Sequence, residues 1–281
     1  MFFLILSIVF GTIMSIAMRL SEGKIKSRIG MLASNYFISV IMAGSFMGLG
    51  NILPKAEGTG LTIGIGAING VIYMLALLLY KYSVDRSGVV LSSVFSKMGS
   101  LLVPLVISIF AFGEVPTIFQ VVGFFLAIYA IILINYKKSN VRTGLGYGMV
   151  LLALLICEGF ASAMSKIYNE VGNRDLSDNF MFFTFFSAFI ICCIILLWKK
   201  ERPGKSEFLF GIMIGVPNFM ATRFILKALE SVPAVIVYPL RSIAIILLTT
   251  FVGIFVFRER LSRKQFIALV MMMLSLFLLN I

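Results

Sequence analysis

Residues 88–112, GVVLSSVFSKMGSLLVPLVISIFAF, form a long stretch in which Lys97 is the only charged residue. This stretch exceeds the roughly 20 apolar residues that an α-helix needs to cross about 30 Å of hydrocarbon. The rest of the chain is similar, since 60% of its 281 residues are hydrophobic and only 13% are charged. A water-soluble domain carries about 25% charged residues. The sequence therefore predicts an all-α integral membrane protein with no room for a sizeable soluble domain.

Apolar runs separated by Gly, Pro and charged residues predict ten transmembrane helices. We expect them at residues 1–19, 30–50, 61–80, 88–112, 117–135, 143–168, 178–198, 206–229, 232–257 and 265–281. The connecting loops are short, so neighbouring helices are expected to be antiparallel. Residues 1–19 lack a basic start and a small-residue cleavage site, which favours a retained helix over a secretory signal.

The Lys and Arg residues gather in alternate loops, and this distribution predicts the orientation. The loops after the first, third, fifth, seventh and ninth predicted helices carry Arg19, Lys24, Lys26, Arg28, Lys81, Arg86, Lys137, Lys138, Arg142, Lys199, Lys200, Arg202, Lys205, Arg258, Arg260, Arg263 and Lys264. The opposite side has only Lys55, Lys166, Arg174 and Lys227. Because cation-rich loops stay in the cytoplasm, both termini are expected outside an inner or plasma membrane. The same rule explains the net charge of +12 without a nucleic-acid partner.

An internal repeat divides the chain at about residue 140. A shift of 145 positions places Phe110, Phe112, Glu114, Gln120 and Asn135 on Phe255, Phe257, Glu259, Gln265 and Asn280. Gly66-x-x-Asn69 likewise corresponds to Gly215-x-x-Asn218, and Ser15-x3-Arg19 to Ser162-x3-Lys166. Five helices per half give the halves opposite orientations. We therefore expect two inverted-topology repeats, residues 1–140 and 141–281, with a solute site where they face each other near the midplane.

Ten helices in two five-helix repeats, each with an acidic joint between its last two helices, resemble the drug/metabolite transporter superfamily, EamA type. The two joints are Phe112-Gly113-Glu114 and Phe257-Arg258-Glu259. The resemblance covers essentially the whole chain. It implies a transporter of a small solute, and relatives of this kind move amino acids, choline, nucleotide sugars, sugar phosphates or drugs. The resemblance does not name the solute.

Polar residues inside the predicted helices are the candidates for solute binding. An ionisable group deep in a bilayer costs about 2.5–3.5 kcal/mol on insertion scales and usually marks a solute pathway. Polar residues at helical spacing share the faces of these charges and are expected to wall a hydrated cavity. The candidate substrate-binding residues are Lys97, Arg241, Glu158, Tyr238, Asn69, Asn218, Tyr73, Ser93, Ser100 and Arg223.

Each candidate also has a purely structural interpretation. Ser, Thr and Asn in membrane helices often bridge neighbouring helices. Glu158 could serve as a structural partner of Lys97 or Arg241, and Arg223 could extend to the membrane surface. The three cysteines lie in apolar runs, which favours buried thiols over disulfides.

The residue content argues against an enzyme. The chain has no histidine, no phosphate-binding loop and no Cys/His metal set, so neither a metal nor another cofactor is expected. The sequence favours a secondary transporter of a small polar, anionic metabolite, acting as a monomer or homodimer. Export of zwitterionic amino acids or of drugs is the alternative with the same fold. A lipid-headgroup flippase or scramblase is the alternative of another class.

Overall fold

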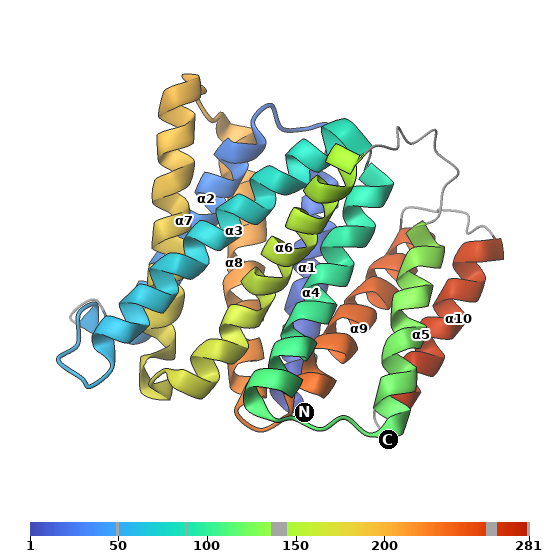
Figure 1. Cartoon of the computed structure of the whole chain (residues 1–281). Helices are drawn as coiled ribbons and strands as arrows, with labels where there is room; N and C mark the ends of the chain where they lie inside the picture. The colour runs from blue at the N-terminus through green and yellow to red at the C-terminus, as the bar shows by residue number, and fades with distance from the viewer. Residues whose placement is uncertain (49–50, 88, 136–144, 257–262, 280–281) are drawn as a thin grey trace. The chain divides into compact units, whose positions relative to one another are not determined.

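The computed structural model describes residues 1–48, 51–87, 89–135, 145–256 and 263–279. These residues form ten α-helices and one short 3-10 helix (Figure 1). In chain order they are α1 (Phe2–Ser21), α2 (Arg28–Met47), α3 (Thr59–Ser87), α4 (Val89–Phe112), α5 (Ile118–Asn135), α6 (Leu145–Val171), η2 (Arg174–Leu176), α7 (Ser177–Lys199), α8 (Lys205–Leu229), α9 (Ala234–Phe255) and α10 (Arg263–Leu279).

Each α-helix coincides with one of the ten predicted spans, and most ends agree within a few residues. The largest difference is in α3, which continues to Ser87 instead of ending near residue 80. Phe257, Glu259 and Asn280, which carry part of the repeat pattern, lie outside the described residues.

The helices have the length and surface of a membrane protein. Within the described residues, eight helices are long and apolar enough to cross a membrane, and α5 contains a shorter apolar stretch, Ile118–Leu133. Large apolar side chains such as Phe119, Phe125 and Phe277 are exposed. A soluble protein would not leave so much apolar surface uncovered, whereas lipid tails accept it. The chain is therefore an all-α, multi-pass membrane protein.

Local sequence signals set the helix ends next to the charged residues discussed below. Ser27 caps α2, because its hydroxyl oxygen accepts the N–H of Gly30 at 3.0 Å. The chain turns after α4 at Gly113, whose φ of 68° favours glycine. Pro233 directly precedes α9 and presets its first turn.

Two compact units make up the structure. Unit 1 comprises Met1–Met74 and Ile167–Ser231, and unit 2 comprises Leu75–Lys166 and Val232–Ile281. Helices α3 and α6 pass from one unit to the other along their length. Each unit thus takes helices from both halves of the sequence.

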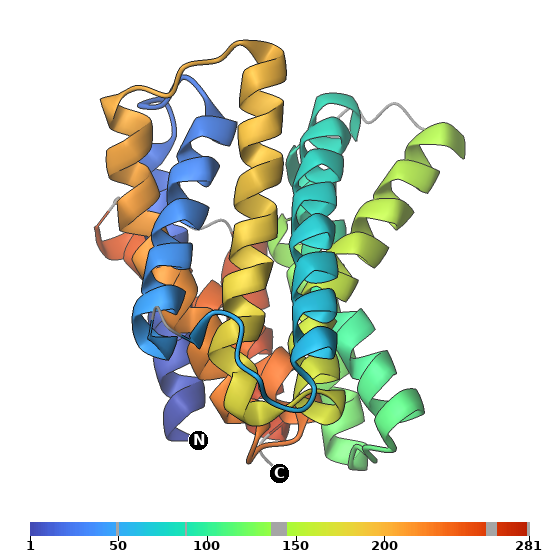
Figure 2. The same ribbon diagram turned by 90° about the vertical axis from the view of Figure 1, so that its left-hand side faces the viewer.

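In unit 1, α8 packs against α1 and α2, and α2 also packs against α7, as Figure 2 shows for α2, α7 and α8. Its centre is aromatic, with Tyr168, Phe180, Phe185 and Phe219 almost fully buried. The rings of Tyr168 and Phe180 stack with their centroids 4.2 Å apart. This aromatic centre supplies the tight packing that membrane helices need in place of a hydrophobic driving force.

The two Gly-x-x-Asn motifs make equivalent contacts within unit 1. A Cβ atom on Gly66 would lie 2.8 Å from the Phe180 carbonyl oxygen, and one on Gly215 would lie 2.7 Å from the Asn35 carbonyl oxygen. The amide of Asn69 donates to the Thr184 hydroxyl at 3.3 Å, and that of Asn218 donates to the Asn35 side chain, also at 3.3 Å. Glycine thus permits close helix approach in both places, and an asparagine three residues later bridges the same helices.

In unit 2, α4 packs against α9 and α5 packs against α10. These are the fourth and fifth helices of the two sequence halves, so equivalent helices pair with each other. The centre is aliphatic, with Leu101, Ile131, Ile243 and Met272 fully buried. Ser275 on α10 donates its hydroxyl to the Gly123 carbonyl of α5 at 2.6 Å, which fixes this pair.

Candidate functional site

Three charged side chains interact within unit 2. Lys97 on α4 interacts electrostatically with Glu158 on α6 and with Arg241 on α9. The Glu158 carboxylate also accepts a side-chain hydrogen bond from Ser96. We call Lys97, Glu158 and Arg241 the deep charge cluster.

The positions of these residues along their helices put the cluster far from the helix ends. With a rise of 1.5 Å per residue, Lys97 lies about 12 Å from the start of α4 and Arg241 about 10 Å from the start of α9. Glu158 lies about 20 Å into α6. The Lys97 side chain is exposed, and those of Glu158 and Arg241 are half-buried.

Helices α4 and α6 approach each other closely beside the cluster, because glycines lie at their crossing. A Cβ on Gly99, two residues after Lys97, would collide with the backbone of Leu155 on α6. A Cβ on Gly159, directly after Glu158, would lie 2.8 Å from the Gly99 carbonyl oxygen. The two glycines thus bring Lys97 and Glu158 onto neighbouring backbones.

A row of polar contacts extends from the cluster to one end of unit 2. Glu158, Ser162 and Lys166 lie four residues apart and share one face of α6, while Tyr238 and Arg241 share a face of α9. The Tyr238 hydroxyl donates to the Ser162 carbonyl oxygen at 3.0 Å. The buried Tyr238 therefore links α9 to α6 one turn away from Arg241.

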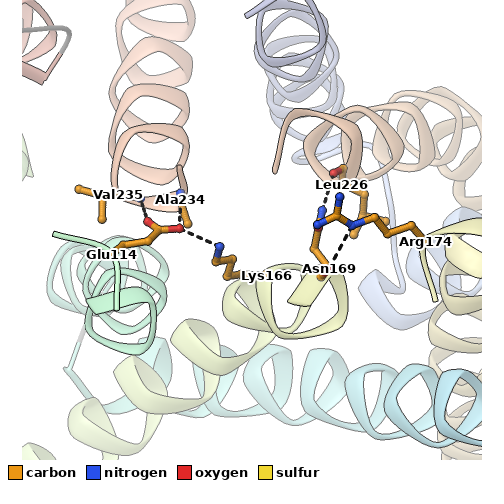
Figure 3. A network of polar contacts seen from close by, with 7 residues as sticks. All are labelled: Glu114, Lys166, Asn169, Arg174, Leu226, Ala234 and Val235. Atoms are coloured by element: carbon orange, nitrogen blue, oxygen red, sulfur yellow. Dashed lines mark hydrogen bonds and ion pairs between the residues drawn. The ribbon is translucent and has the colours of Figure 1, made fainter. Parts of the chain in front are cut away.

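The row ends at a group that we call the Glu114 cluster, formed by Glu114, Lys166, Ala234 and Val235 (Figure 3). The Glu114 carboxylate forms an ion pair with the Lys166 ammonium at 2.7 Å and accepts the backbone N–H groups of Ala234 at 3.0 Å and Val235 at 2.9 Å. Lys166 also lies over the ring of Phe112, 5.4 Å from its centroid. These contacts join the joint after α4, the end of α6 and the start of α9.

The electrostatics of the Glu114 cluster favour the ionised carboxylate. Burial tends to raise the pKa of Glu114, but the Lys166 ammonium and the two backbone N–H donors outweigh it, so the pKa lies below its usual value. The N–H groups belong to the first turn of α9, where the helix dipole also favours a negative charge. Glu114 therefore acts as a charged cap on α9.

Two further candidates, Ser93 and Ser100, lie on α4 in unit 2. The Ser93 hydroxyl and the Tyr80 hydroxyl form a hydrogen bond of 2.9 Å, which connects α4 to α3. Ser100 donates to the carbonyl oxygen of Lys97 at 3.0 Å, so its hydroxyl is used within its own helix. Both are structural contacts next to the deep charge cluster.

The remaining candidates belong to unit 1, where they also contact protein groups. Asn69 and Asn218 bridge helices as described above, and Tyr73 lies one turn beyond Asn69 on α3. Arg223 forms a two-pronged ion pair with Asp178, with N–O distances of 2.9 and 3.0 Å, and its guanidinium lies 3.9 Å from the centroid of the Phe46 ring. The structure thus brings Lys97, Glu158, Arg241 and Tyr238 into one unit and places these four in the other.

The sequence analysis did not assign a role to three features of the site. Glu114 marked the repeat, but nothing in the pattern indicated that it pairs with Lys166 or caps α9. Gly99 and Gly159 carried no signal, because close helix approach depends on which helices are neighbours. No group of three or more His, Cys, Asp or Glu side chains that could hold a metal ion occurs within the described residues.

Comparison with known proteins gives a family resemblance for the second half of the chain. Residues 145–281 match the sequence profile of the EamA-like transporter family. Over these residues the chain is similar to EamA-like transporters. This family is part of the drug/metabolite transporter superfamily, and its members are transporters rather than enzymes. An EamA-like transporter implies a small-molecule solute and a lipid bilayer as partners.

Two relatives extend over nearly the whole chain. An uncharacterized protein of Haemophilus influenzae is 21% identical over 256 residues, which cover 88% of this chain and 86% of that protein. A crystal structure of another protein matches with a TM-score of 0.79 at 14% identity, covering 99% of this chain and 94% of that one. The second match shows that this ten-helix arrangement occurs as a fold in a protein of very different sequence.

Proposed function

We propose that this protein is an alternating-access carrier for a small polar solute with at least one negative group. The observation that carries the proposal is the deep charge cluster, where Lys97 interacts with the Glu158 carboxylate and with a second cation, Arg241. The empty site keeps a positive charge, which is costly in a bilayer. A bound anion would cancel this charge and would be stabilised by both cations.

The two cations would bind an anion with different geometries. The planar guanidinium of Arg241 can bind a carboxylate or phosphate through two parallel N–H donors, whereas the Lys97 ammonium acts as a point charge. The hydrogen bonds of Ala234 to Glu114 and of Tyr238 to Ser162 hold the part of α9 that precedes Arg241. Arg241 is therefore the better candidate for orienting the solute, and Lys97 for attracting it.

The charge balance also supports obligatory exchange. If the two cations repel when the site is empty, the protein changes conformation more easily with a bound anion than without one. Exchange of solute across the membrane is then faster than net transport. Glu158 neutralises part of the charge in both states and need not carry a proton across the membrane.

Orientation belongs to the same proposal, with both termini outside an inner or plasma membrane. At one end of unit 1 the loop after α1 contacts the loop after α7 through Ser27 and Glu201, and the start of α8 through Lys26 and Ser27 with Glu207. At the other end the loop after α2 contacts the start of α7, where Asn179 donates to the Asn51 carbonyl oxygen at 2.8 Å. This pairing agrees with the alternation from which the loop charges predict the cytoplasmic side.

Purified protein in liposomes provides the test. We expect phosphates or carboxylates to stabilise the protein in a thermal-shift screen and to exchange across the liposome membrane, with faster exchange than net uptake. Lys97→Ala and Arg241→Ala should each weaken binding at least tenfold without unfolding the protein, and Arg241→Lys should impair exchange more than Lys97→Arg. Lys81→Ala, which removes an exposed cation at the end of α3, serves as the control.

Several outcomes would overturn the proposal. Stabilisation by amines alone would contradict an anionic solute, and amino acids as the best ligands, with loss of binding in Glu158→Gln, would favour the zwitterionic alternative. Headgroup translocation without exchange of soluble anions would favour a flippase. Normal exchange by both alanine variants would show that Lys97 and Arg241 are structural.

A further inference from the structure

Two loops from different halves of the sequence form one surface at an end of unit 1. The backbone N–H groups of Lys26 and Ser27, before α2, donate to the Glu207 carboxylate at 2.7 and 3.2 Å. The same carboxylate accepts the N–H of Gly204 at 2.9 Å, and the Ser27 hydroxyl bonds to the Glu201 carboxylate. Residues 19–28 and 199–205 are therefore held together, and Figure 2 shows both connections at the same end of unit 1.

This surface is strongly basic, and we call it the basic end. Its exposed cationic side chains are Arg19, Lys24, Lys26, Arg28, Lys199, Lys200, Arg202 and Lys205. Three acids lie in or next to these loops. Glu207 is 3% exposed and its oxygens accept backbone N–H groups, whereas Glu201 is exposed and binds the Ser27 hydroxyl. Glu22 is also exposed, so eight exposed cations outnumber two exposed carboxylates at this surface.

A tryptophan next to the basic end indicates its level in the membrane. Trp198, the only tryptophan in the chain, is 82% exposed in the last turn of α7, directly before Lys199 and Lys200. Tryptophan at a helix end is typical of the boundary between hydrocarbon and headgroups. Helix α7 ends at Lys199, and the next residue, Lys200, adopts the left-handed conformation with a φ of 54°. The chain therefore turns directly after the exposed tryptophan.

We propose that the basic end binds the phosphate groups of anionic phospholipids, such as phosphatidylglycerol, from the surrounding bilayer. A cluster of four to eight Lys and Arg next to a membrane helix is the arrangement that attracts anionic headgroups. The arginines can grip phosphate oxygens through paired N–H donors, and the lysines add point charges. The exposed apolar residues Leu197 and Trp198 would contact the acyl chains of the same lipid. This site is independent of solute transport by the deep charge cluster.

The fluorescence of Trp198 provides the probe for the test. The protein is reconstituted in phosphatidylcholine bilayers that contain increasing fractions of brominated phosphatidylglycerol or, separately, brominated phosphatidylcholine, and quenching of its fluorescence is measured. We expect quenching at severalfold lower fractions of brominated phosphatidylglycerol. Each cation near an anionic surface contributes about 1 kcal/mol, or about fivefold. Removing two cations is therefore enough to abolish a severalfold preference, so it should be lost in Lys26→Gln/Lys205→Gln and in raised salt.

The matched control is Lys55→Gln/Lys81→Gln, which removes two exposed lysines elsewhere and should keep the preference. Equal quenching of the wild-type protein by the two lipids would overturn the proposal, and so would the same loss in the control variant. Loss of the preference on adding inorganic phosphate at constant ionic strength would indicate a site for a soluble anion and would also overturn it. The salt series on the wild-type protein decides the matter even if the double variant does not fold.

Discussion

Replacing Glu114 by glutamine tests whether the Glu114 cluster joins three helices. Glutamine keeps the shape of the side chain but places an NH2 group where an oxygen now accepts a backbone N–H or faces Lys166. A hydrogen bond to a charged group contributes about 1.5–3 kcal/mol, and an unpartnered charge left from a buried pair costs about 3–5 kcal/mol. The side chains of Lys166 and Glu114 are only 5% and 15% exposed. We expect Glu114→Gln to lower the free energy of unfolding by about 3 kcal/mol.

A double-mutant cycle separates the ion pair from the cap on α9. Lys166→Met leaves Glu114 with its two N–H donors, so we expect it to cost about 2 kcal/mol. The double variant leaves no unpartnered charge and should cost about 3 kcal/mol, well below the sum of the single variants. Thermal unfolding followed by circular dichroism measures this, since 1 kcal/mol corresponds to about 2–4 °C in a domain of 150–250 residues.

The control and the pH dependence make this prediction specific. Glu230→Gln removes an exposed carboxylate at the end of α8 and should leave the melting temperature unchanged. The pKa of Glu114 is lowered in the folded state. Its contribution to the free energy of unfolding is therefore complete above its unfolded-state pKa of about 4.3, and is lost as pH falls through its folded-state pKa. The difference in melting temperature between the wild-type protein and Glu114→Gln should thus be constant from pH 8 to pH 6 and shrink only below about pH 4. The reasoning would be refuted if the stability losses of the two single variants summed to that of the double variant. It would also be refuted if the melting-temperature difference changed near neutral pH.

Three other changes test the packing, the second ion pair and the orientation. Gly99→Ala should lower the melting temperature and transport together by forcing α4 away from α6, whereas Gly148→Ala on α6, where a Cβ meets no atom within 4 Å, should change neither. Arg223→Lys should lose the two-pronged pair and the ring contact and cost about 1–2 kcal/mol in a melting experiment, while transport persists if the pair is structural. In a background without native cysteines, Lys55→Cys should react with an impermeant reagent from outside intact cells and Lys24→Cys should not; the reverse labelling would overturn the predicted orientation.

The helices could be predicted from sequence because membrane helices depend on local composition. Every backbone group must be satisfied within the helix, so an apolar stretch of sufficient length is enough. The ten spans therefore coincide with the observed helices. Helix α3 was predicted too short because its last residues, such as Lys81 and Asp85, are charged. Polar end residues can continue a helix beyond the hydrocarbon, and hydropathy does not detect this.

The deep charges could also be predicted, and so could Glu158 as a partner of Lys97 or Arg241, but the sequence did not show which of the two cations it meets. Lys97, Glu158 and Arg241 stand out in sequence because charge in an apolar helix is rare. Which of them meet depends on which helices are neighbours, and this in turn depends on small residues such as Gly99 and Gly159. Asn69 and Asn218 looked like equally good ligands, yet each bridges two helices through a contact that only the packing reveals.

The same three helices carry both the deep charge cluster and the Glu114 cluster. Helix α4 bears Lys97 and leads into Glu114, α6 bears Glu158 and Lys166, and α9 begins at the N–H groups that Glu114 binds and continues to Arg241. Each helix is therefore held near the Glu114 cluster by an ion pair or by hydrogen bonds to a charged group. A charge held on a fixed helix costs less reorganisation when an anion binds than one on a mobile segment. If the proposed anion transport is correct, these contacts keep the two cations in place, and charge neutralisation rather than loop ordering provides the energy of solute binding.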